Sequence, residues 1–315
     1  MMNKRVYGVL GIVSIMANWN ADFSGYPKTT SKGDIFGSDK AFKYPMKKLW
    51  DESGEKVLYI KSMTVKSEKK GGVFLTPRTL WERYQYLFGT EDGKDAKKIL
   101  TNLFRSIDVK NFGATFAEEG NNISITGAVQ FGQGFNKYAN SVPQEQQILS
   151  PFRDSKAVQK SKDKEEAKSS TLGTKIVSDE AHYFYPFSIN PKVYKEYEEL
   201  GVTEGYTLQD YEAFKKAALC AATSFATNAK AGCENEFGLF VETQEDLYLP
   251  NLAEHILFEH REGEKNRIVV ECGGLLNDLD KKIMKVEIYY NPYTTELETN
   301  LSDVKTYHIF TGKEI

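Results

Sequence analysis

The chain has 315 residues and a net charge of −3, and its 40% hydrophobic, 13% aromatic and 27% charged residues can build a sizeable core. Its apolar runs fall short of the roughly 18 residues of a membrane-spanning helix, so we expect no membrane partner. Residues 1–50 hold eight Lys or Arg and three Asp or Glu; this basic end would suit an anionic partner or head-to-tail contact with a second copy, but chance segregation would also produce it.

The first predicted element is an apolar run, 6–17, that follows Lys4 and Arg5. A secretion signal has a similar basic start and a similar length. This run, however, is rich in β-branched residues and is interrupted by glycines, which favours a buried strand. The bulky Trp19 also stands where a cleavage site needs a small residue. We therefore predict a strand and a cytoplasmic protein.

The next element is the basic stretch "GSDKAFKYPMKKLWDES", in which lysines alternate with aromatic residues. If Pro45 lies in the first turn of a short helix, Lys43 and Lys47 are four residues apart and share a face. Cations on a rigid element can bind phosphates, and neighbouring rings can stack on bases. An ordinary amphipathic helix with a solvated face would show the same pattern.

Four further helices are predicted from their end signals and apolar spacing. A Thr-Pro start, with Thr76 as the cap, and a closing glycine indicate a helix over 76–89, and the same apolar pattern follows over 94–108. Asn-Pro and Gly delimit another helix over 190–201. The stretch 207–232 opens with a Thr-x-x-Asp capping pattern, and we expect it to be the longest helix and to cover a sheet.

Strand-like runs are intermixed with these helices without regular βαβ spacing, which favours an α+β fold with an antiparallel sheet. In the clearest case, Tyr183, Tyr185, Phe187 and Ile189 alternate along one run and should share a face. The predicted strands after the first are 57–63, 123–131, 181–189, 238–242, 267–272, 285–290 and 306–310.

Residues 153–170, "RDSKAVQKSKDKEEAKSS", differ from their surroundings because they contain no aromatic residue and many charges. Such a segment cannot bury enough apolar surface to offset the entropy of ordering. It lies between two predicted strands, so we expect a mobile insertion.

Recognisable catalytic signatures do not occur in the sequence. The glycine-rich stretch "GAVQFGQGF" lacks the spacing of a dinucleotide-binding loop, and its glycines more simply allow close backbone approach. Asp22, Asp34 and Asp39 could hold a metal or act as a base, but aspartates are common in turns and caps, and we interpret them so. No cofactor is predicted.

The cysteines and histidines are scattered and are interpreted as structural. No two cysteines have the C-x-x-C spacing, and structural zinc normally requires four ligands in close pairs. No metal site is therefore predicted among Cys220, Cys233, Cys272, His182, His255, His260 and His308.

Four stretches, in order, resemble the backbone subunit of CRISPR Cascade complexes, a guide-RNA-binding family of the RAMP superfamily, especially its type I-B-like branch. They are "VSIMANWNADFSG", "AFKYPMKKLW" after "DIFGSD", "IDVKNFGATFAEEGNNISITGAVQFGQG" and "LGTKIVSDEAHYFYPFSIN". The resemblance covers residues 4 to about 290. It implies a modified RNA-recognition-motif, ferredoxin-like sheet in one hand-shaped domain, 1–315, with a finger insertion at 64–118 and a thumb insertion at 142–178.

The resemblance also implies which residues meet the guide RNA. Asn18 and Asn20 match a polar loop that contacts the RNA backbone. Lys43, Lys47 and Lys48 match the cations of a basic helix that hold phosphates. Tyr44 and Pro45 depart from the family pattern beside those lysines, so one contact is in doubt. The residues matched by position are Asn18, Asn20, Lys43, Lys47, Lys48, Gln130, Gly132, Gln133, Leu172, Thr174 and Lys175.

By this resemblance the protein is a non-catalytic subunit that polymerises head-to-tail along a guide RNA (crRNA) and lets the guide pair with a target DNA strand. Its partners would then be the guide, the target strand, copies of itself and other Cascade subunits. Two alternatives remain open. One is a metal-dependent endoribonuclease subunit of a type III-like complex that uses Asp22 or Asp39, and the other is an unrelated assembly protein such as a sheath subunit.

Overall fold

The structure is a computed structural model that describes residues 2–67, 71–89, 95–149 and 172–315. At its centre, β1 (Lys4–Ala17) pairs antiparallel with β10 (Leu172–Ile189) along one edge and with β11 (Cys233–Gln244) along the other. The strand predicted over 6–17 is confirmed and begins two residues earlier.

These three strands belong to a sheet with nine strands within the described residues. The others are β2 (Phe36–Gly37), β7 (Val129–Phe131), β8 (Gly134–Asn136), β9 (Pro143–Leu149), β14 (Ile283–Tyr290) and β16 (Lys305–His308). The order is β16-β14-β11-β1-β10-β8-β2, and β7 and β9 also pair with β10. All pairs are antiparallel except β14 with β16.

Side chains alternate across β1 and face two separate cores. Val6, Leu10 and Ile12 belong to the first core, and Tyr7 and Val9 belong to the second. This follows from the two-residue period of a strand. Because both faces are covered, the strand reads in the sequence as a nearly continuous apolar run instead of an alternating one.

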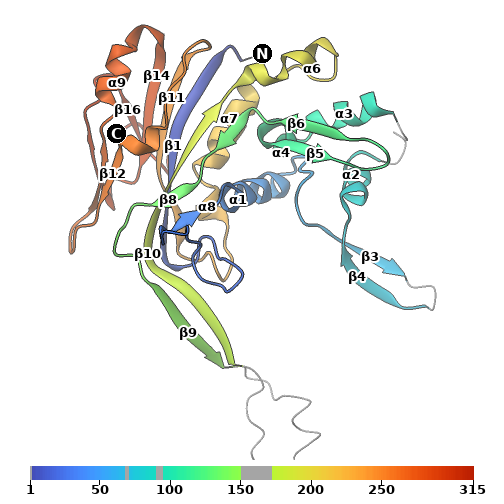
Figure 1. Cartoon of the computed structure of the whole chain (residues 1–315), viewed down its shortest axis with the longest axis horizontal. Coiled ribbons are helices and arrows are strands. Elements are labelled where there is room, and N and C mark those ends of the chain that lie inside the picture. Colours follow the sequence, from blue (N-terminus) through green and yellow to red (C-terminus); the bar gives the residue numbers. More distant parts are fainter. Residues whose placement is uncertain (1, 68–70, 90–94, 150–171) are drawn as a thin grey trace, which may run out of the picture.

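Helices cover the first core, and a smaller sheet covers the second (Figure 1). α1 (Asp39–Glu52) contributes Phe42, and α7 (Leu208–Ala218) contributes Phe214, to the first core. The second core is closed by η2 (Leu252–His255) and by a three-stranded sheet of β12 (Ile256–Glu259), β13 (Asn266–Val270) and β15 (Thr295–Thr299). Helices and a largely antiparallel sheet thus occur together, as predicted for an α+β protein.

A lateral unit lies beside α1 (Figure 1). It consists of β3 (Met63–Ser67), β4 (Val73–Pro77), α2 (Leu80–Phe88), α3 (Ala96–Phe104), α4 (Ile107–Phe112), β5 (Gly113–Phe116) and β6 (Ile123–Thr126). Tyr84, Leu103 and Phe116 from this unit are buried in the first core, so the unit shares its core with the main sheet.

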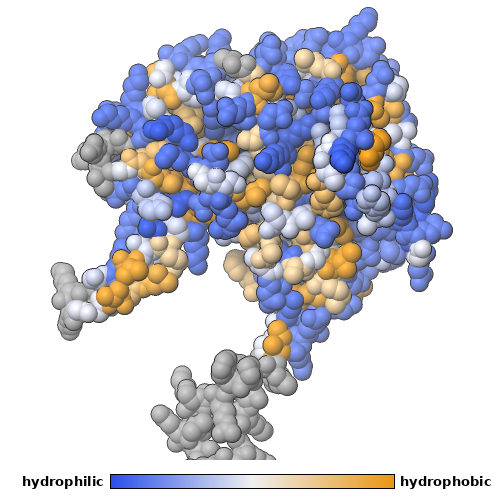
Figure 2. All heavy atoms as spheres, turned by 180° about the vertical axis from the view of Figure 1, so that it is seen from behind, coloured by the Kyte–Doolittle hydropathy of each residue, from blue (hydrophilic) through white to orange (hydrophobic). Residues whose placement is uncertain are grey.

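The β3–β4 hairpin of this unit exposes an apolar face. Val65 pairs with Leu75 and Ser67 pairs with Val73, so these side chains lie on one face of the ribbon. Val65, Val73 and Leu75 are exposed, and Figure 2 shows apolar side chains gathered on this projection.

A second hairpin consists of β9 and the first half of β10, and it projects away from the main sheet (Figure 1). At its root, the Asp179 carboxylate accepts hydrogen bonds from the amides of Val142 (2.7 Å) and Glu180 (2.6 Å). The segment 153–170, for which we expect a mobile insertion, lies outside the described residues.

The remaining elements are short. The helix predicted over 190–201 is present as η1 (Pro191–Tyr194) followed by α6 (Lys195–Glu199). The others are α8 (Ala221–Ser224), α9 (Gly273–Asp278) and η3 (Asp280–Lys282). Along the described part of the chain, no helix is both long and apolar enough to cross a membrane.

The strand predicted over 57–63 is wrong except for Met63, which begins β3. The amides of Leu58 and Tyr59 donate to the two carboxylate oxygens of Asp108, both at 2.8 Å. The Arg83 guanidinium donates to the carbonyl of Val57 at 2.7 Å. Side chains therefore satisfy these backbone groups, and no strand partner is needed.

Two helix ends were also misplaced. Thr79, not Thr76, caps α2, because Thr79 and Glu82 form a reciprocal capping box, whereas Thr76 lies in β4. The helix predicted over 207–232 ends at Ala218, where Asn235 of β11 donates to the Ala218 carbonyl at 2.8 Å. Consequently α7, with 11 residues, is shorter than α1, with 14.

Candidate nucleic-acid interface

The lysines of α1 form the centre of the candidate site. Ser38 caps the helix, so Pro45 lies in its interior and not in its first turn as expected. Lys43 and Lys47 do share a face, as predicted. Both ammonium groups lie over the ring of Phe112, at 5.2 Å and 5.9 Å from its centre.

Two more rings complete a surface beneath these ammonium groups. Phe131 of β7 lies 5.9 Å from Lys43, and Tyr59 lies 5.5 Å from Lys47. We call Tyr59, Phe112 and Phe131 the aromatic shelf. Cations held over ring faces gain roughly 0.5–2 kcal/mol each, so the shelf fixes the two lysines in position.

Each of the two lysines has one carboxylate partner. Lys43 pairs with Asp39 at 2.9 Å, and Lys47 lies 3.6 Å from Asp108. Burial lowers the pKa of Lys47, and the charge of Asp108 opposes this only in part. Since its ammonium is poorly solvated and weakly paired, a phosphate arriving at this face would stabilise the charged form.

Lys48 lies differently. It is 3.5 Å from Glu52 and 3.9 Å from Asp51, both exposed enough to be solvated. It is one residue beyond Lys47 and therefore about a quarter-turn around the helix. The resemblance grouped Lys48 with Lys43 and Lys47, but the structure brings only the latter two together over the shelf.

The polar loop after β1 packs against the start of α1 and the second hairpin. The Asn18 amide donates to the carbonyls of Gly25 (2.8 Å) and Ile176 (3.2 Å), and the side chain is buried. The Asn20 carboxamide oxygen accepts from the amide of Ser38 at 2.8 Å. Both asparagines thus shape the loop from inside, and Asn20 ties it to the cap of α1.

Lys230, which was not among the residues expected from the sequence, also supports this loop. Lys230 donates to the carbonyls of Asn18, at 2.7 Å, and Trp19. Its ammonium lies 5.3 Å from the Trp19 ring, and burial lowers its pKa. A cation here partly offsets the negative ends of carbonyls in the loop.

Gln130, Gly132 and Gln133 lie at the end of β7 and the start of the link to β8, and all three are exposed. Gln130 donates to the Gly127 carbonyl at 2.8 Å. Gly132 approaches the Pro186 ring so closely that an added side chain would collide with it, as expected for a close-approach glycine. Gln130 and Gly132 line a cleft of about 430 Å³ beside Pro186 and Leu252.

Thr174 and Lys175 lie on the projecting part of β10, opposite Gln147 and Gln146 of β9. Thr174 is exposed and Lys175 is half-buried. The backbone of Leu172 pairs with that of Leu149. Ile176, one residue beyond Lys175, accepts the bond from Asn18, so the hairpin and the polar loop are joined at this point.

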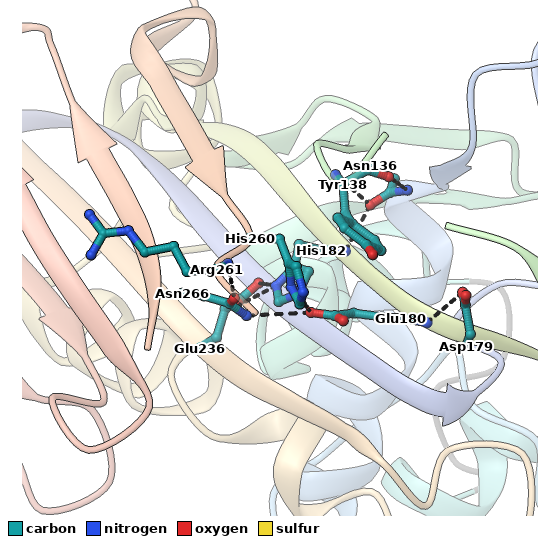
Figure 3. Close-up of polar contacts among 9 residues, drawn as sticks. All are labelled: Asn136, Tyr138, Asp179, Glu180, His182, Glu236, His260, Arg261 and Asn266. Carbon is teal, nitrogen blue, oxygen red and sulfur yellow. Dashed lines mark hydrogen bonds and ion pairs between the residues drawn. The ribbon is translucent and has the colours of Figure 1, made fainter. Parts of the chain in front are cut away.

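The root of the hairpin is held by a charged cluster around His182 (Figure 3). The Nδ1 atom of His182 lies 2.8 Å from Glu236 of β11, and its Nε2 atom lies 2.8 Å from Glu180. Glu180 is in turn 3.3 Å from His260, and the imidazole of His182 stacks on Phe258 with ring centres 3.8 Å apart. We call His182, Glu180 and Glu236 the histidine clamp.

The clamp keeps His182 protonated. Burial by itself would lower the pKa of His182, but Glu236 and Glu180 outweigh it and raise the pKa to about 9. The hydrogen bond from His182 likewise lowers the pKa of Glu180. At neutral pH the clamp is therefore an imidazolium between two carboxylates that joins β10 to β11.

Sequence reasoning missed the aromatic shelf and its anchor, Asp108. The signal was present, because Asp108 and Phe112 belong to the "IDVKNFG" stretch that carried part of the resemblance. Their function could not be read from spacing, since Asp108 contacts Leu58, Tyr59 and Lys47, which are 49 to 61 residues away in the sequence.

The aspartates proposed for metal chemistry have other roles in this structure. Asp22 accepts three hydrogen bonds inside a turn, and Asp39 pairs with Lys43. Among the residues that the structure describes, no group of three His, Cys, Asp or Glu side chains lies close enough to share a metal ion.

An α+β fold that holds two half-buried ammonium groups over aromatic rings can bind phosphate groups. The family described as "CRISPR-associated protein Cas7" matches residues 4–272. This match spans most of the sequence, and the chain therefore belongs to the Cas7 family.

Comparison with solved structures returns two chains titled "CRISPR RNA-guided surveillance complex, pre-nicking" and "CRISPR RNA-guided surveillance complex". Each is 13% identical to this chain with a TM-score of 0.49. The first alignment covers 94% of this chain and 96% of its counterpart, and the second covers 93% and 95%. Comparison with curated proteins returns no significant match.

Proposed function

We propose that this protein is a non-catalytic, cytoplasmic subunit that binds guide RNA and polymerises head-to-tail along it as the backbone of a type I CRISPR Cascade complex. The observation that carries the proposal is the pair Lys43 and Lys47, held over one aromatic shelf in a member of the Cas7 family. Such a surface grips phosphates and leaves the bases free to pair with a target DNA strand.

The topology supports an RNA-recognition-motif-like core. β11, β1, β10 and the β7–β8 edge lie side by side, all antiparallel. α1 lies between β1 and that edge in the chain, and α7 lies between β10 and β11. This is the strand and helix order of a ferredoxin-like fold. We further assign 64–118 as the finger insertion and 142–178 as the thumb insertion of a single domain.

Head-to-tail polymerisation is supported by unlike surfaces on one chain. The β3–β4 face is apolar and exposed, whereas β9 of the second hairpin is rich in glutamine. When a surface of one copy contacts a different surface of the next, the product is an open helical filament. Other Cascade subunits would then bind at the filament ends or along its sides.

The first experiment measures the nucleic acid bound to the purified full-length chain. Short RNA of uniform length that copurifies, and binding of labelled single-stranded RNA that weakens with salt, are the expected results. A protein that carries no RNA and ignores added RNA at low ionic strength would contradict the proposal and favour an unrelated assembly protein.

The second experiment separates binding from cleavage. The RNA-loaded chain is incubated with target RNA and Mg²⁺, and the products are resolved by length. We expect intact target. Regularly spaced cuts that disappear in Asp22→Ala or Asp39→Ala would instead establish the endoribonuclease alternative.

A further inference from the structure

The turn 22–26 of the polar loop is closed by hydrogen bonds. A single carboxylate oxygen of Asp22 accepts hydrogen bonds from the amide and hydroxyl of Ser24, at 2.8 Å and 2.7 Å, and from the amide of Tyr26, at 3.1 Å. The amide of Asp22 also donates to the Tyr26 carbonyl at 2.8 Å. Such a side-chain-closed turn fixes the direction of the residue at its tip.

The residue at that tip is Phe23, which is fully exposed, with a relative exposure of 113%. Leaving a phenyl ring in water forgoes roughly 1.5–3 kcal/mol of burial. The loop has no general tendency to expose its rings, because the neighbouring Trp19 is completely buried. The hydrogen-bonded turn thus presents this ring outward, where its face is open to a stacking partner.

The turn is also fixed relative to the second hairpin. The Tyr26 hydroxyl donates to Glu145 of β9. Asn18 links the Gly25 carbonyl to the Ile176 carbonyl of β10, as described above. Phe23 therefore projects from a loop that is bonded to both strands of the hairpin and, through Asn20, to the first turn of α1.

We propose that Phe23 is a platform on which a nucleobase of the bound RNA stacks beside the hairpin. This inference rests on the proposed function and adds a contact to the bases, whereas Lys43 and Lys47 contact phosphates. Every base has a π-face, so such stacking tolerates any guide sequence.

A base fits this ring better than a protein surface does. Contiguous exposed apolar patches mark protein interfaces, and the face with Val65, Val73 and Leu75 on β3–β4 is such a patch. Phe23 is instead flanked by Asp22 and Ser24, which are polar and exposed. A single ring among polar neighbours is the pattern of stacking residues in proteins that hold single strands.

The test compares Phe23→Ala and Phe23→Tyr with Tyr293→Ala, which removes another strongly exposed ring (78%) from the link between β14 and β15. Each full-length variant is titrated with a uridine oligomer and with an abasic sugar-phosphate strand of the same length. We expect Phe23→Ala to weaken oligomer binding about ten-fold and to leave abasic binding unchanged. Phe23→Tyr and Tyr293→Ala should bind both strands as the unmodified chain does.

A spectroscopic test uses Phe23→Trp with Tyr293→Trp as its control. Stacking should quench the fluorescence of the new indole at position 23 on addition of the uridine oligomer, but not of the abasic strand. If the unmodified chain binds the oligomer while Phe23→Ala binds equally well, the stacking role is wrong and the proposed function stands. If Phe23→Ala changes self-association without RNA, the ring contacts protein and the inference is overturned. If neither the unmodified chain nor any variant binds RNA, both the stacking role and the proposed function are wrong.

Discussion

The α1 lysines and the histidine clamp are built from the same components, namely cations, carboxylates and aromatic rings, yet they differ in how the cation is enclosed. Lys43 and Lys47 each have one carboxylate partner, and their side chains are 16% and 17% exposed. His182 has a carboxylate on each ring nitrogen, and its side chain is 2% exposed.

This difference explains the opposite pKa shifts. Around Lys47, burial outweighs a single carboxylate at 3.6 Å, and the pKa is lowered. Around His182, two carboxylates at 2.8 Å outweigh burial, and the pKa is raised. A cation that is under-neutralised and reachable can recruit a polyanion, whereas one that is fully neutralised and enclosed stabilises the fold. The predictions below test this distinction.

The largest effect is expected from breaking the clamp with His182→Leu. Glu236 would be left buried without its cation, which should lower the free energy of unfolding by about 3–5 kcal/mol. Urea unfolding of the full chain measures this loss. The control is His260→Ala, which removes a half-exposed contact to Glu180 and should lower it by no more than about 1 kcal/mol. Equal losses in the two variants would contradict the distinction.

The second prediction concerns pH. Because the folded-state pKa of His182 is raised from 6.5 to about 9, its stabilising contribution is complete below pH 6.5 and disappears as the pH rises through about 9. The free energy of unfolding should therefore fall by about 3 kcal/mol between pH 6.5 and 9.5. His182→Leu should lack this part of the decline. A variant with the same pH profile as the unmodified chain would refute the assignment.

The third prediction concerns the shelf lysines. Lys43→Gln with Lys47→Gln should weaken single-stranded RNA binding about ten-fold at all sequences and reduce the slope of log K against log salt by about 1.4. Glutamine is preferable to glutamate because a new carboxylate at position 47 would face Asp108. Lys281→Gln with Lys305→Gln, two exposed lysines in the C-terminal part, is the charge-matched control. An unchanged slope would exclude a phosphate role.

The smallest effect is expected from Lys48→Gln. Its ammonium faces Asp51 and Glu52 in solvent, not the shelf, and surface ion pairs contribute about 0–1 kcal/mol. RNA affinity should change less than about two-fold. The free energy of unfolding should change by less than about 0.5 kcal/mol. If Lys48→Gln weakens RNA binding as much as Lys43→Gln alone, then Lys48 belongs with Lys43 and Lys47, as the family resemblance implies. The side-chain geometry would in that case have separated it from them wrongly.

Several features could be predicted from sequence because their signals are local. The β-branched run predicted β1, and the alternation of Tyr183, Tyr185, Phe187 and Ile189 placed them together in the first core. The spacing of Lys43 and Lys47 correctly put them on one helical face. The Thr-x-x-Asp pattern fixed the start of α7 at Thr207.

Other features depended on contacts between distant parts of the chain. The expected strand at 57–63 gave way to side-chain bonds from Asp108 and Arg83, and the long helix after Thr207 was ended by Asn235. Local patterns contain no information about which remote side chain will satisfy a backbone group.

The sequence by itself thus determined the elements whose periodicity and end signals lie within a few residues, together with the motifs that tie the chain to its family. Only the tertiary structure decided which cations are enclosed and which remain available. That outcome depends on how many carboxylates and rings converge on each ammonium or imidazolium in space. The convergence joins residues such as His182 and Glu236, which are 54 positions apart and share no local pattern.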